Sequence, residues 1–326
     1  MNGISVIIPI FGVEKFIERC AVSLMEQTLC SVEYIFVDDA TPDGSIDILQ
    51  EVLNRYPQRK QNSRIIHHEV NKGLPAARNT GLQYANGKYV FHCDSDDFLE
   101  KDGLEKLYTT AETEEADIVW CDFYLSFEKK ERYMHQPDYP TSFDALKAML
   151  SGAMKYNVWN KLVKRSLYED NEISFPDGYG MGEDMTMLKL FAHAEKVAYV
   201  HQAFYHYVQL NTGAFSKTYS DIHLQELRHN VDDVLCYLDD SFGDSLEKEY
   251  AFFKLDVKFP FLISSDNRKY KLWCNWYTEA DRFIGENPVT SRRSMLLQKM
   301  ASKHHFWFVW LYFQVIYNFI YRLLFR

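Results

Sequence analysis

The sequence predicts an α/β protein with a mostly parallel central sheet and a helical C-terminal extension. Three observations carry this prediction. The first hundred residues alternate short β-branched runs with helical segments, acidic clusters follow two of those runs, and the pattern from about residue 221 is mostly helical. Strands separated by helices of about ten to fifteen residues form right-handed βαβ units, whose sheet is covered on both faces.

The elements are predicted in order along the chain. Apolar periodicity predicts strands at 4–10, 33–37, 64–67 and 89–93 and helices at 14–27, 45–55 and 74–85. The middle is less regular: we expect a strand at 117–127, a helix at 142–154, and a strand pair or one extended segment at 197–208. Residues 156–182 are rich in aromatic and turn residues, which predicts a loop region over the sheet.

Composition bounds the class of protein. The 326 residues are 47% hydrophobic and 16% aromatic, enough for a large core, and their number favours about two domains. A net charge of −10 argues against a nucleic-acid partner, because such binding needs basic surface. The charge is uneven, since residues 287–326 hold six Lys and Arg and no acidic residue. That asymmetry suggests an anionic surface as the partner of the tail.

The cysteines and the N-terminus indicate a compartment. The six cysteines show no C-x-x-C spacing, and several lie in apolar runs. The chain opens directly into the first predicted strand, without the pattern of a signal peptide. We therefore expect reduced thiols and a cytoplasmic protein.

Acidic residues follow the second and fourth predicted strands. Asp38 and Asp39 follow one strand, and Asp94, Asp96 and Asp97 follow the other. Ligands of open parallel sheets bind beyond the carboxyl ends of the strands, so these clusters mark a candidate site. Carboxylates placed together raise one another's pKa unless a cation compensates, which favours Mg²⁺ or Mn²⁺ bridging to a substrate phosphate. The alternative is that these residues only cap helices or form turns.

The sequence lacks the two common glycine-rich phosphate-binding motifs, and the turn after the first strand shows this for the dinucleotide-binding motif. That turn reads Pro9-Ile-Phe-Gly-Val-Glu14, with one glycine in place of the three of a dinucleotide-binding motif. A Walker-type loop is also missing from the sequence. Phosphate binding is therefore expected to depend on a metal and basic side chains.

Four motifs carry a resemblance to a known family. They are Ser5-Val-Ile-Ile-Pro9, Val37-Asp-Asp-Ala-Thr-Pro-Asp-Gly-Ser45, Asn71-Lys-Gly-Leu-Pro-Ala-Ala-Arg-Asn-Thr-Gly81 and Asp94-Ser-Asp-Asp97. In this order and spacing they resemble the large inverting glycosyltransferase family 2, which includes bacterial enzymes of surface polysaccharide, capsule and lipopolysaccharide synthesis. The resemblance implies a GT-A, Rossmann-like nucleotide-sugar-binding domain. It is strong over residues 3–125 and weaker to about 220.

The resemblance also implies roles for individual residues. The donor-binding set would be Pro9, Phe11, Asp38, Asp39, Arg78, Asp94, Ser95 and Lys217. Asp39 would bind a uracil-type base, Phe11 would face that base, and Arg78 would reach the nucleotide or its phosphates. Asp94 would face the ribose or donor sugar. Asp96 and Asp97 are the candidate metal ligands, between which spacing does not decide. Phe11 as core and Arg78 as a solvated helix residue remain the alternatives.

The second half supplies the expected base. Gly180-Met-Gly-Glu183-Asp184 resembles the family's acidic pair at the start of a helix, so we predict Asp184 as the general base and Glu183 as its positioning or acceptor-binding partner. A helix N-terminus would favour the ionised form; the alternative is that the acidic pair only caps that helix. Trp159 is either an acceptor platform or core. His206 is expected to be an ordinary strand histidine rather than a metal ligand, and Gln209 stands where many relatives have arginine.

The tail predicts association with a membrane. Residues 306–326 include ten aromatic residues, and Gln314, Asn318, Arg322 and Arg326 recur every fourth residue as a polar stripe. A helix over this tail would nearly match the thickness of a bilayer, so a single span is possible. The polar stripe and basic flank fit an interfacial helix better. Docking onto a protein surface is the alternative.

Together these patterns predict a glycosyltransferase that uses a UDP-sugar and Mn²⁺ or Mg²⁺. It would act from the cytoplasm, peripherally on the inner face of the cell membrane, on a glycan or lipid-linked glycan acceptor. The expected domains are 1–220 (nucleotide-binding half 1–100, acceptor half 101–220), a helical extension 221–305 and the tail 306–326. The alternatives are a metal-dependent phosphohydrolase and an inactive nucleotide-binding membrane scaffold.

Overall fold

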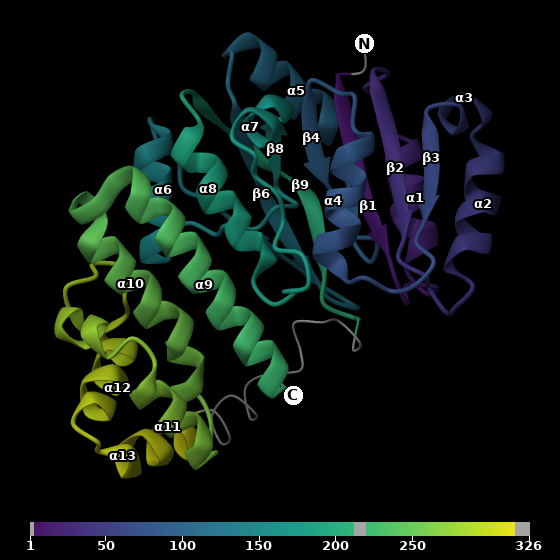
Figure 1. Cartoon of the computed structure of the whole chain (residues 1–326). Coiled ribbons are helices and arrows are strands. Elements are labelled where there is room, and N and C mark those ends of the chain that lie inside the picture. The colour runs from purple at the N-terminus through teal and green to yellow at the C-terminus, as the bar shows by residue number, and fades with distance from the viewer. Residues whose placement is uncertain (1–2, 212–219, 317–326) are drawn as a thin grey trace. The chain divides into compact units, whose positions relative to one another are not determined.

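The computed structural model describes residues 3–211 and 220–316 (Figure 1). The chain divides into two compact units. The first runs from the N-terminus to Leu146 and from Tyr156 to Leu238, and the second comprises Lys147–Lys155 and the chain from Asp239 onward. The helix at 221–242 therefore lies mainly in the first unit, whereas the sequence predicted a domain boundary before it.

One nine-stranded sheet forms the centre of the first unit. Its strands are β1 (Ile4–Ile10), β2 (Val32–Asp38), β3 (Ser63–His67), β4 (Tyr89–His92), β5 (Phe98–Leu99), β6 (Ile118–Ser126), β7 (Glu131–Met134), β8 (Lys161–Lys164) and β9 (Val197–Val208). The order is β3-β2-β1-β4-β8-β6-β9-β5, with β7 paired to β6. Strands β3, β2, β1 and β4 are parallel, and β8 is antiparallel to both of its neighbours.

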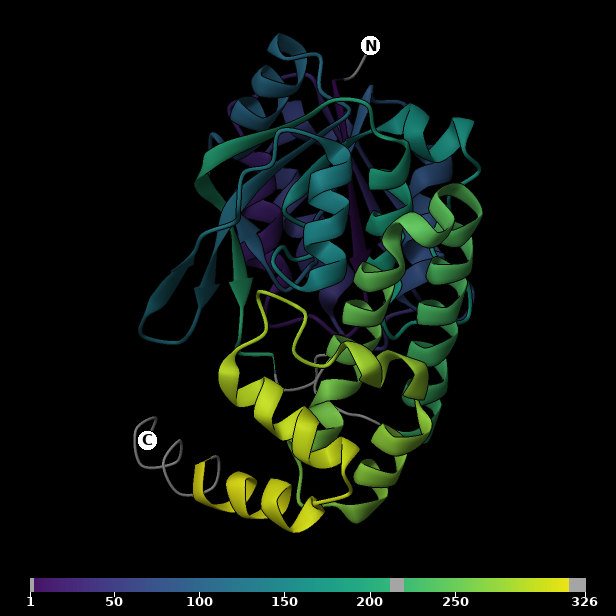
Figure 2. The same ribbon diagram turned by 90° about the vertical axis from the view of Figure 1, so that its left-hand side faces the viewer.

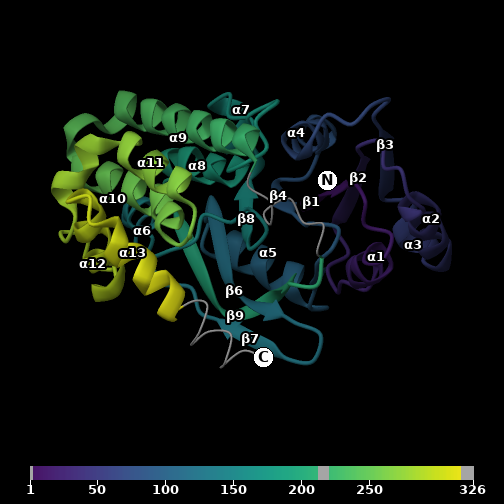
Figure 3. The same ribbon diagram turned by 90° about the horizontal axis from the view of Figure 1, so that it is seen from below.

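Helices cover both faces of this sheet (Figure 3). Those that begin in the first unit are α1 (Ile17–Met25), α2 (Ser45–Arg55), α3 (Pro57–Lys60), α4 (Leu74–Tyr84), α5 (Gly103–Thr113), α6 (Ser142–Ser151), α7 (Arg165–Asp170), the 3₁₀ turn η1 (Glu183–Met185), α8 (Thr186–His193) and α9 (Asp221–Phe242). Every residue of β1 and β2 is buried, as expected of strands covered on both faces. Helix α4 packs so closely on β1 that only glycine fits at position 81. A Cβ there would lie 2.3 Å from Cγ2 of Ile7.

The sequence located the regular elements better than the irregular ones. The predicted alternation over residues 1–93 is confirmed, although α1 is shorter than expected at both ends. The prediction of a loop region at 156–182 was wrong in part, because this segment holds β8 and α7. The segment 197–208 is one long strand. Strand β8 is short and rich in lysine, so its apolar pattern gave no strand signal.

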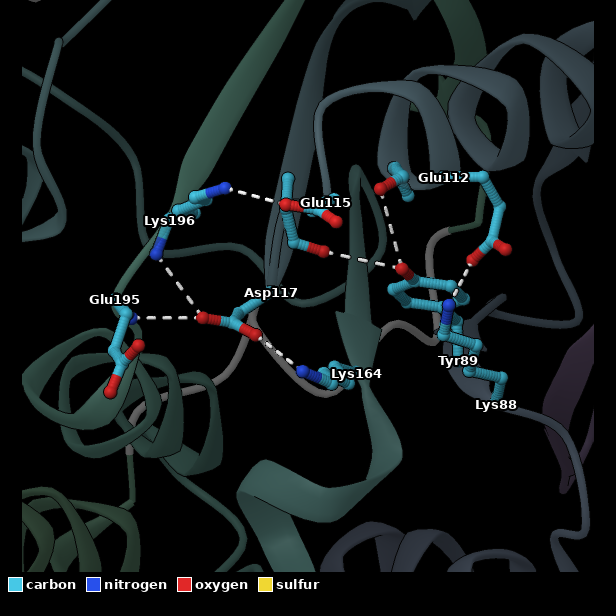
Figure 4. Close-up of polar contacts among 10 residues, drawn as sticks. Lys88, Tyr89, Glu112, Glu115, Asp117, Lys164, Glu195 and Lys196 are labelled. Carbon is cyan, nitrogen blue, oxygen red and sulfur yellow. Dashed lines mark hydrogen bonds and ion pairs between the residues drawn. The ribbon is translucent and has the colours of Figure 1, made fainter.

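A buried carboxylate joins strand and loop at one end of the sheet. Asp117 accepts hydrogen bonds from the backbone N–H groups of Glu195 and Lys196 and forms an ion pair with Lys164 at 2.9 Å (Figure 4). Lys196 in turn pairs with Glu115. These bonds lower the pKa of Asp117 although its burial opposes the shift. The carboxylate therefore fixes the ends of β6, β8 and β9 together.

The second unit is helical. It contains η3 (Gly243–Leu246), α10 (Glu247–Lys258), η4 (Phe259–Leu262), α11 (Asn267–Asn275), η5 (Thr278–Phe283), α12 (Arg292–Ser302) and α13 (Phe306–Tyr312). Its core includes a fully buried lysine, Lys258, whose ammonium group donates to the carbonyl of Trp276 and pairs with Asp281. Within residues 3–211 and 220–316, every helix is too short or too polar to cross a bilayer. Part of the predicted tail, 317–326, lies outside the described residues.

Candidate active site

Two loops at the carboxyl ends of parallel strands build the candidate site. Strands β1, β2 and β4 run side by side, so the residues that follow them emerge at the same edge of the sheet. Asp38 and Asp39 stand at the end of β2, and Asp94 comes two residues after β4. The expected convergence of these two clusters at one edge of the sheet therefore agrees with the strand order.

Asp39 is held by the loop before α4. Its Oδ1 accepts from the N–H of Lys72 and its Oδ2 from the N–H of Gly73, each at 2.8 Å. His68 lies 2.7 Å from Oδ1 through Nδ1, and its other nitrogen contacts the hydroxyl of Thr80. Asp39 is buried, and these three contacts fix its orientation. His68 was not singled out in the sequence, because nothing in its local pattern marks it as a partner of Asp39.

The neighbouring residues shape the mouth of this loop. Asp38 accepts from the N–H of Thr41 at 2.8 Å and contacts His67, so it supports the turn after β2. Pro9 is buried within β1, beside Val37 of β2. Phe11, at the end of β1, is 51% exposed, which excludes the alternative that it is a core residue. Its ring is available for stacking against a ligand.

The acidic residues after β4 have different environments. Asp94 pairs with Arg78 at 3.0 Å, and Asp96 accepts from the side chain of Asn211 at 2.8 Å. Asp97 is fully buried and accepts from the hydroxyl of Tyr205 and the N–H of Val208, one on each oxygen. Asp97 is therefore engaged as an anchor of β9. Asp94 and Asp96 are partly exposed, in contrast to the fully buried Asp97. Ser95, between Asp94 and Asp96 in sequence, is buried.

Burial and mutual repulsion act on these carboxylates. The pKa of Asp96 is raised by burial and by the charge of Asp94, and the pKa of Asp97 is raised by burial and by the charges of Asp96 and Asp94. Within residues 3–211 and 220–316, no group of three His, Cys, Asp or Glu side chains is arranged to hold a metal ion. A divalent cation completed by ligand oxygens would relieve the repulsion.

Arg78 lies beneath the site as a buried cation. Its side chain is 1% exposed and sits between Asp94, at 3.0 Å, and Glu183, at 3.7 Å. The ring of Phe175 covers the guanidinium group, with 5.5 Å between them. The nearby carboxylates raise the pKa of Arg78 although burial opposes this. The alternative that Arg78 is a solvated helix residue is wrong, and such burial leaves little of its surface for the predicted contact with the nucleotide or its phosphates.

Glu183 and Asp184 bring a second pair of carboxylates to the same arginine. They open η1, which follows Gly182 in a left-handed conformation at φ 92° that favours glycine. Burial raises the pKa of both, and the charge of Asp184 raises that of Glu183 further, while Arg78 opposes both shifts. Among the described residues, Oδ1 of Asp184 has no hydrogen-bond partner. An unpartnered carboxylate oxygen with a raised pKa is suited to accept a proton.

A buried lysine, missed in the sequence, interacts electrostatically with Asp184. Lys161 in β8 is fully buried and donates to the carbonyl of Asn157 and to Asn160. Burial lowers its pKa to about 7, and the charge of Asp184 partly offsets that effect. The feature of the sequence that could have identified it is its position two residues after Trp159, in the segment Trp159-Asn-Lys-Leu162. Trp159 itself is 5% exposed and stacks on Tyr205 at 4.6 Å, so it belongs to the core.

A cavity adjoins the acidic pair. It has a volume of about 250 Å³, and the residues that line it include Glu183, Phe175, Tyr179, Lys189 and His229. The rings of Tyr179 and His229 stack at 3.6 Å. Lys189 is paired with Asp233, which also lines the cavity. The cavity thus combines flat rings, carboxylates and a neutralised lysine, a lining that suits a neutral polar ligand better than an anion.

Two remaining predictions concern the segment around β9. His206 contacts Glu100 and Glu131 and stacks between Phe98 and Tyr124. These contacts agree with its prediction as an ordinary strand histidine. Lys217, expected to bind the diphosphate, lies outside the described residues, which resume at 220.

Known proteins share both the sequence pattern and the fold. The model of Glycosyl transferase family 2 matches residues 5–181. The chain is 34% identical to the uncharacterized glycosyltransferase EpsJ of Bacillus subtilis, over 63% of this chain and 60% of EpsJ. It is 31% identical to the cholesterol galactosyltransferase of Borreliella burgdorferi, over 80% of this chain and 74% of the relative. The matched stretch thus spans less than two thirds of EpsJ.

A solved structure extends the likeness over most of the chain. Residues 1–349 of TarS from S. aureus, solved in complex with UDP-GlcNAc, match with a TM-score of 0.70 at 18% identity, covering 96% of this chain and 91% of that one. At this identity the match establishes the fold, which confirms the expected GT-A architecture. Because the family model matches more than half of the chain, the protein belongs to glycosyltransferase family 2.

Proposed function

We propose that this protein transfers a sugar from a UDP-sugar to a hydroxyl group of a glycan or lipid-linked glycan, with inversion at the anomeric carbon. The observation that carries the proposal is the cluster around Arg78. This one buried cation joins Asp94, which follows the donor-side strand β4, to the Glu183–Asp184 pair. The charge of Arg78 therefore acts both on the proposed donor site, through Asp94, and on the proposed proton acceptor, Asp184.

The donor's base would bind at the end of β2. Asp39, oriented by Lys72, Gly73 and His68, would hydrogen-bond uracil, and Phe11 would stack on the ring. Asp38 and Pro9 would keep that loop in place, while Asp94 and Ser95 would face the ribose or sugar. The UDP-GlcNAc complex of TarS supports a uridine nucleotide, because TarS has the same fold.

The diphosphate would bind with Mn²⁺ or Mg²⁺, and the residues fit such an ion. Asp96 is the favoured ligand, because it is partly exposed, whereas Asp97 is fully buried and accepts a hydrogen bond on each carboxylate oxygen. The raised pKa of Asp96 beside Asp94 indicates uncompensated negative charge that a cation would neutralise. When bound, the ion would neutralise charge that develops on the leaving diphosphate. Lys217 would add positive charge to the same group.

Asp184 would act as the general base. The acceptor hydroxyl would give its proton to Oδ1 of Asp184 while the hydroxyl oxygen forms a bond to the anomeric carbon, and UDP would leave from the opposite face with the electrons of the broken bond. Glu183, whose pKa is raised further, would remain protonated and position the acceptor. The cavity beside Glu183 supports an approach of the acceptor sugar from that side.

The place of action would be the cytoplasmic membrane. A lipid-linked or growing surface glycan is presented at the inner face of that membrane, and a cytoplasmic enzyme bound there peripherally would meet it directly. The excess of Lys and Arg over acids after residue 286, together with the aromatic residues from Phe306, supports this location.

Turnover of donor tests the proposal. UDP release is measured with a panel of UDP-sugars and Mn²⁺ for the wild type, Asp96→Ala and Asp184→Asn. The matched controls are Asp47→Ala and Asp47→Asn, which change an exposed carboxylate of α2. We expect Asp184→Asn to lose at least about a hundredfold in rate, as removal of a general base typically does. Asp96→Ala should also lose most of the activity, because it removes the proposed metal ligand, and the controls should keep full activity.

Other outcomes would separate the alternatives. Full activity of both site variants would refute the residue assignment. Release of inorganic phosphate from simple phosphoesters, without need of an acceptor, would indicate a phosphohydrolase. Binding of UDP by calorimetry without turnover of any UDP-sugar would indicate an inactive scaffold.

A further inference from the structure

Helices α12 and α13 of the second unit pack against each other as a hairpin (Figure 2), and α13 exposes an apolar face. Trp307 is 65% exposed, Trp310 is 45% exposed, and Leu311 and Val315, the latter in the π-helical turn that continues α13, are each 46% exposed. Positions 307, 310, 311 and 315 follow the spacing of one helical face. We call these four residues the aromatic face. Two half-exposed tryptophans side by side are unusual for a surface with no partner.

The opposite side of α13 anchors the helix to its own unit. Val309 is fully buried, and the ring of Phe306 stacks on Tyr270 of α11 at 5.2 Å with 9° between the planes. The helix is therefore already packed against protein along one side, and the aromatic face is what remains. A helix packed in this way fits the surface of a bilayer rather than its interior, because lipid can reach only one side.

Helix α12 adds a cationic face to the same hairpin. Arg292 and Lys299 of α12 and its C-cap residue Lys303 are exposed and follow one another at intervals of seven and four residues, which places them along one side of the helix. We call these three residues the cationic stripe. No acidic residue occurs in the sequence from 287 to 326, so no carboxylate of this segment neutralises the stripe.

We propose that this hairpin is the docking surface for an anionic lipid bilayer, with α13 lying in the plane of the interface. This deepens the proposed membrane location and rests on it. The aromatic face would enter the headgroup region, where tryptophan is favoured because its ring is apolar and its N–H finds polar partners. The cationic stripe would contact lipid phosphates, whose charge complements it. The rest of the chain carries a large net negative charge, which an anionic membrane would repel, so docking is confined to this hairpin.

Vesicle binding by the full chain tests this surface. Co-sedimentation is measured with phosphatidylcholine vesicles and with vesicles that also contain phosphatidylglycerol. We expect binding to the second kind only, reversed by high salt because the attraction between exposed charges is screened. The double variant Trp307→Ala/Trp310→Ala should bind at least about tenfold more weakly, since each tryptophan contributes a large apolar area. Arg292→Gln and Lys299→Gln should each weaken binding about fivefold.

The controls separate this proposal from the catalytic one. Phe127→Ala removes an exposed aromatic ring of the β6–β7 turn and should leave vesicle binding unchanged. UDP release without vesicles should be the same in all these variants, so a catalytic failure and a docking failure are distinguishable. Equal binding to both vesicle types, or unchanged binding by the tryptophan variant, would overturn the proposal. Self-association that the tryptophan variant abolishes, without vesicle binding, would identify the face as a contact between two copies and would also overturn it.

Discussion

Removing the charge of Arg78 should change both the stability and the pH dependence of this protein. Arg78→Met replaces a buried cation with an apolar side chain of similar length. Asp94, Glu183 and Asp184 would then face one another without the guanidinium that lies 3.0 Å from Asp94 and 3.7 Å from Glu183. Removing one partner of a buried ion pair costs about 3–5 kcal/mol. We expect a loss of that size in the free energy of unfolding at about pH 8.

The loss should depend on pH in a definite direction. Glu183 and Asp184 already have folded-state pKa values above their usual range. A carboxyl whose pKa is raised on folding lowers the stability as pH rises through the interval between the unfolded and folded pKa values. Without Arg78 these pKa values rise further, so the interval extends to higher pH. The difference in stability between wild type and variant should therefore shrink toward about pH 4, where both carboxyls are protonated.

Activity should follow the same electrostatics. If Asp184 must be ionised to accept the proton, a higher pKa moves the acid limb of the rate profile to higher pH. Arg78→Met should thus lose most of its UDP release at neutral pH and regain part of it in alkaline buffer. Arg78→Lys keeps the charge without the planar group and should show smaller shifts in both assays.

Urea unfolding at about pH 5 and about pH 8, followed by intrinsic fluorescence, measures the first effect, and the pH profile of UDP release measures the second. Arg64→Met, at an exposed arginine of β3, is the matched control and should behave as wild type. The reasoning is refuted if Arg78→Met is as stable as the control at both pH values, or if its acid limb coincides with that of wild type.

Three further predictions concern the fold and the donor site. Gly81→Ala should lower the free energy of unfolding in urea by about 1–3 kcal/mol or more, because its Cβ would overlap Ile7 at 2.3 Å. Asp117→Asn should lower the free energy of unfolding by about 1–3 kcal/mol. Folding lowers the pKa of Asp117, so its carboxylate stabilises the protein above the unfolded-state pKa, and thermal-shift curves should show this stabilisation lost as pH falls through the folded-state pKa. Phe11→Ala should raise the KM for UDP-sugar about tenfold in steady-state kinetics, with kcat nearly unchanged, if its ring stacks on the base.

Local pattern was enough for the first half of the fold. The runs that became β1 and β2 are β-branched and uninterrupted, and helix α2 has the predicted bounds, because burial against one sheet imposes a regular period. Strand β8 escaped prediction for the opposite reason. It holds only four residues, two of them lysines, and pairs with strands remote in sequence.

The candidate site shows the same division. The sequence by itself determined that carboxylates follow the strands of a parallel sheet and that an acidic pair opens a later helical turn, because strand direction and the order of elements follow from short-range pattern. Only the tertiary structure decided that Asp97 anchors β9, that Trp159 is core and that Arg78 is buried among carboxylates. Those outcomes depend on burial and on the charges of side chains that approach from distant segments, and neither quantity is encoded in the spacing of neighbouring residues.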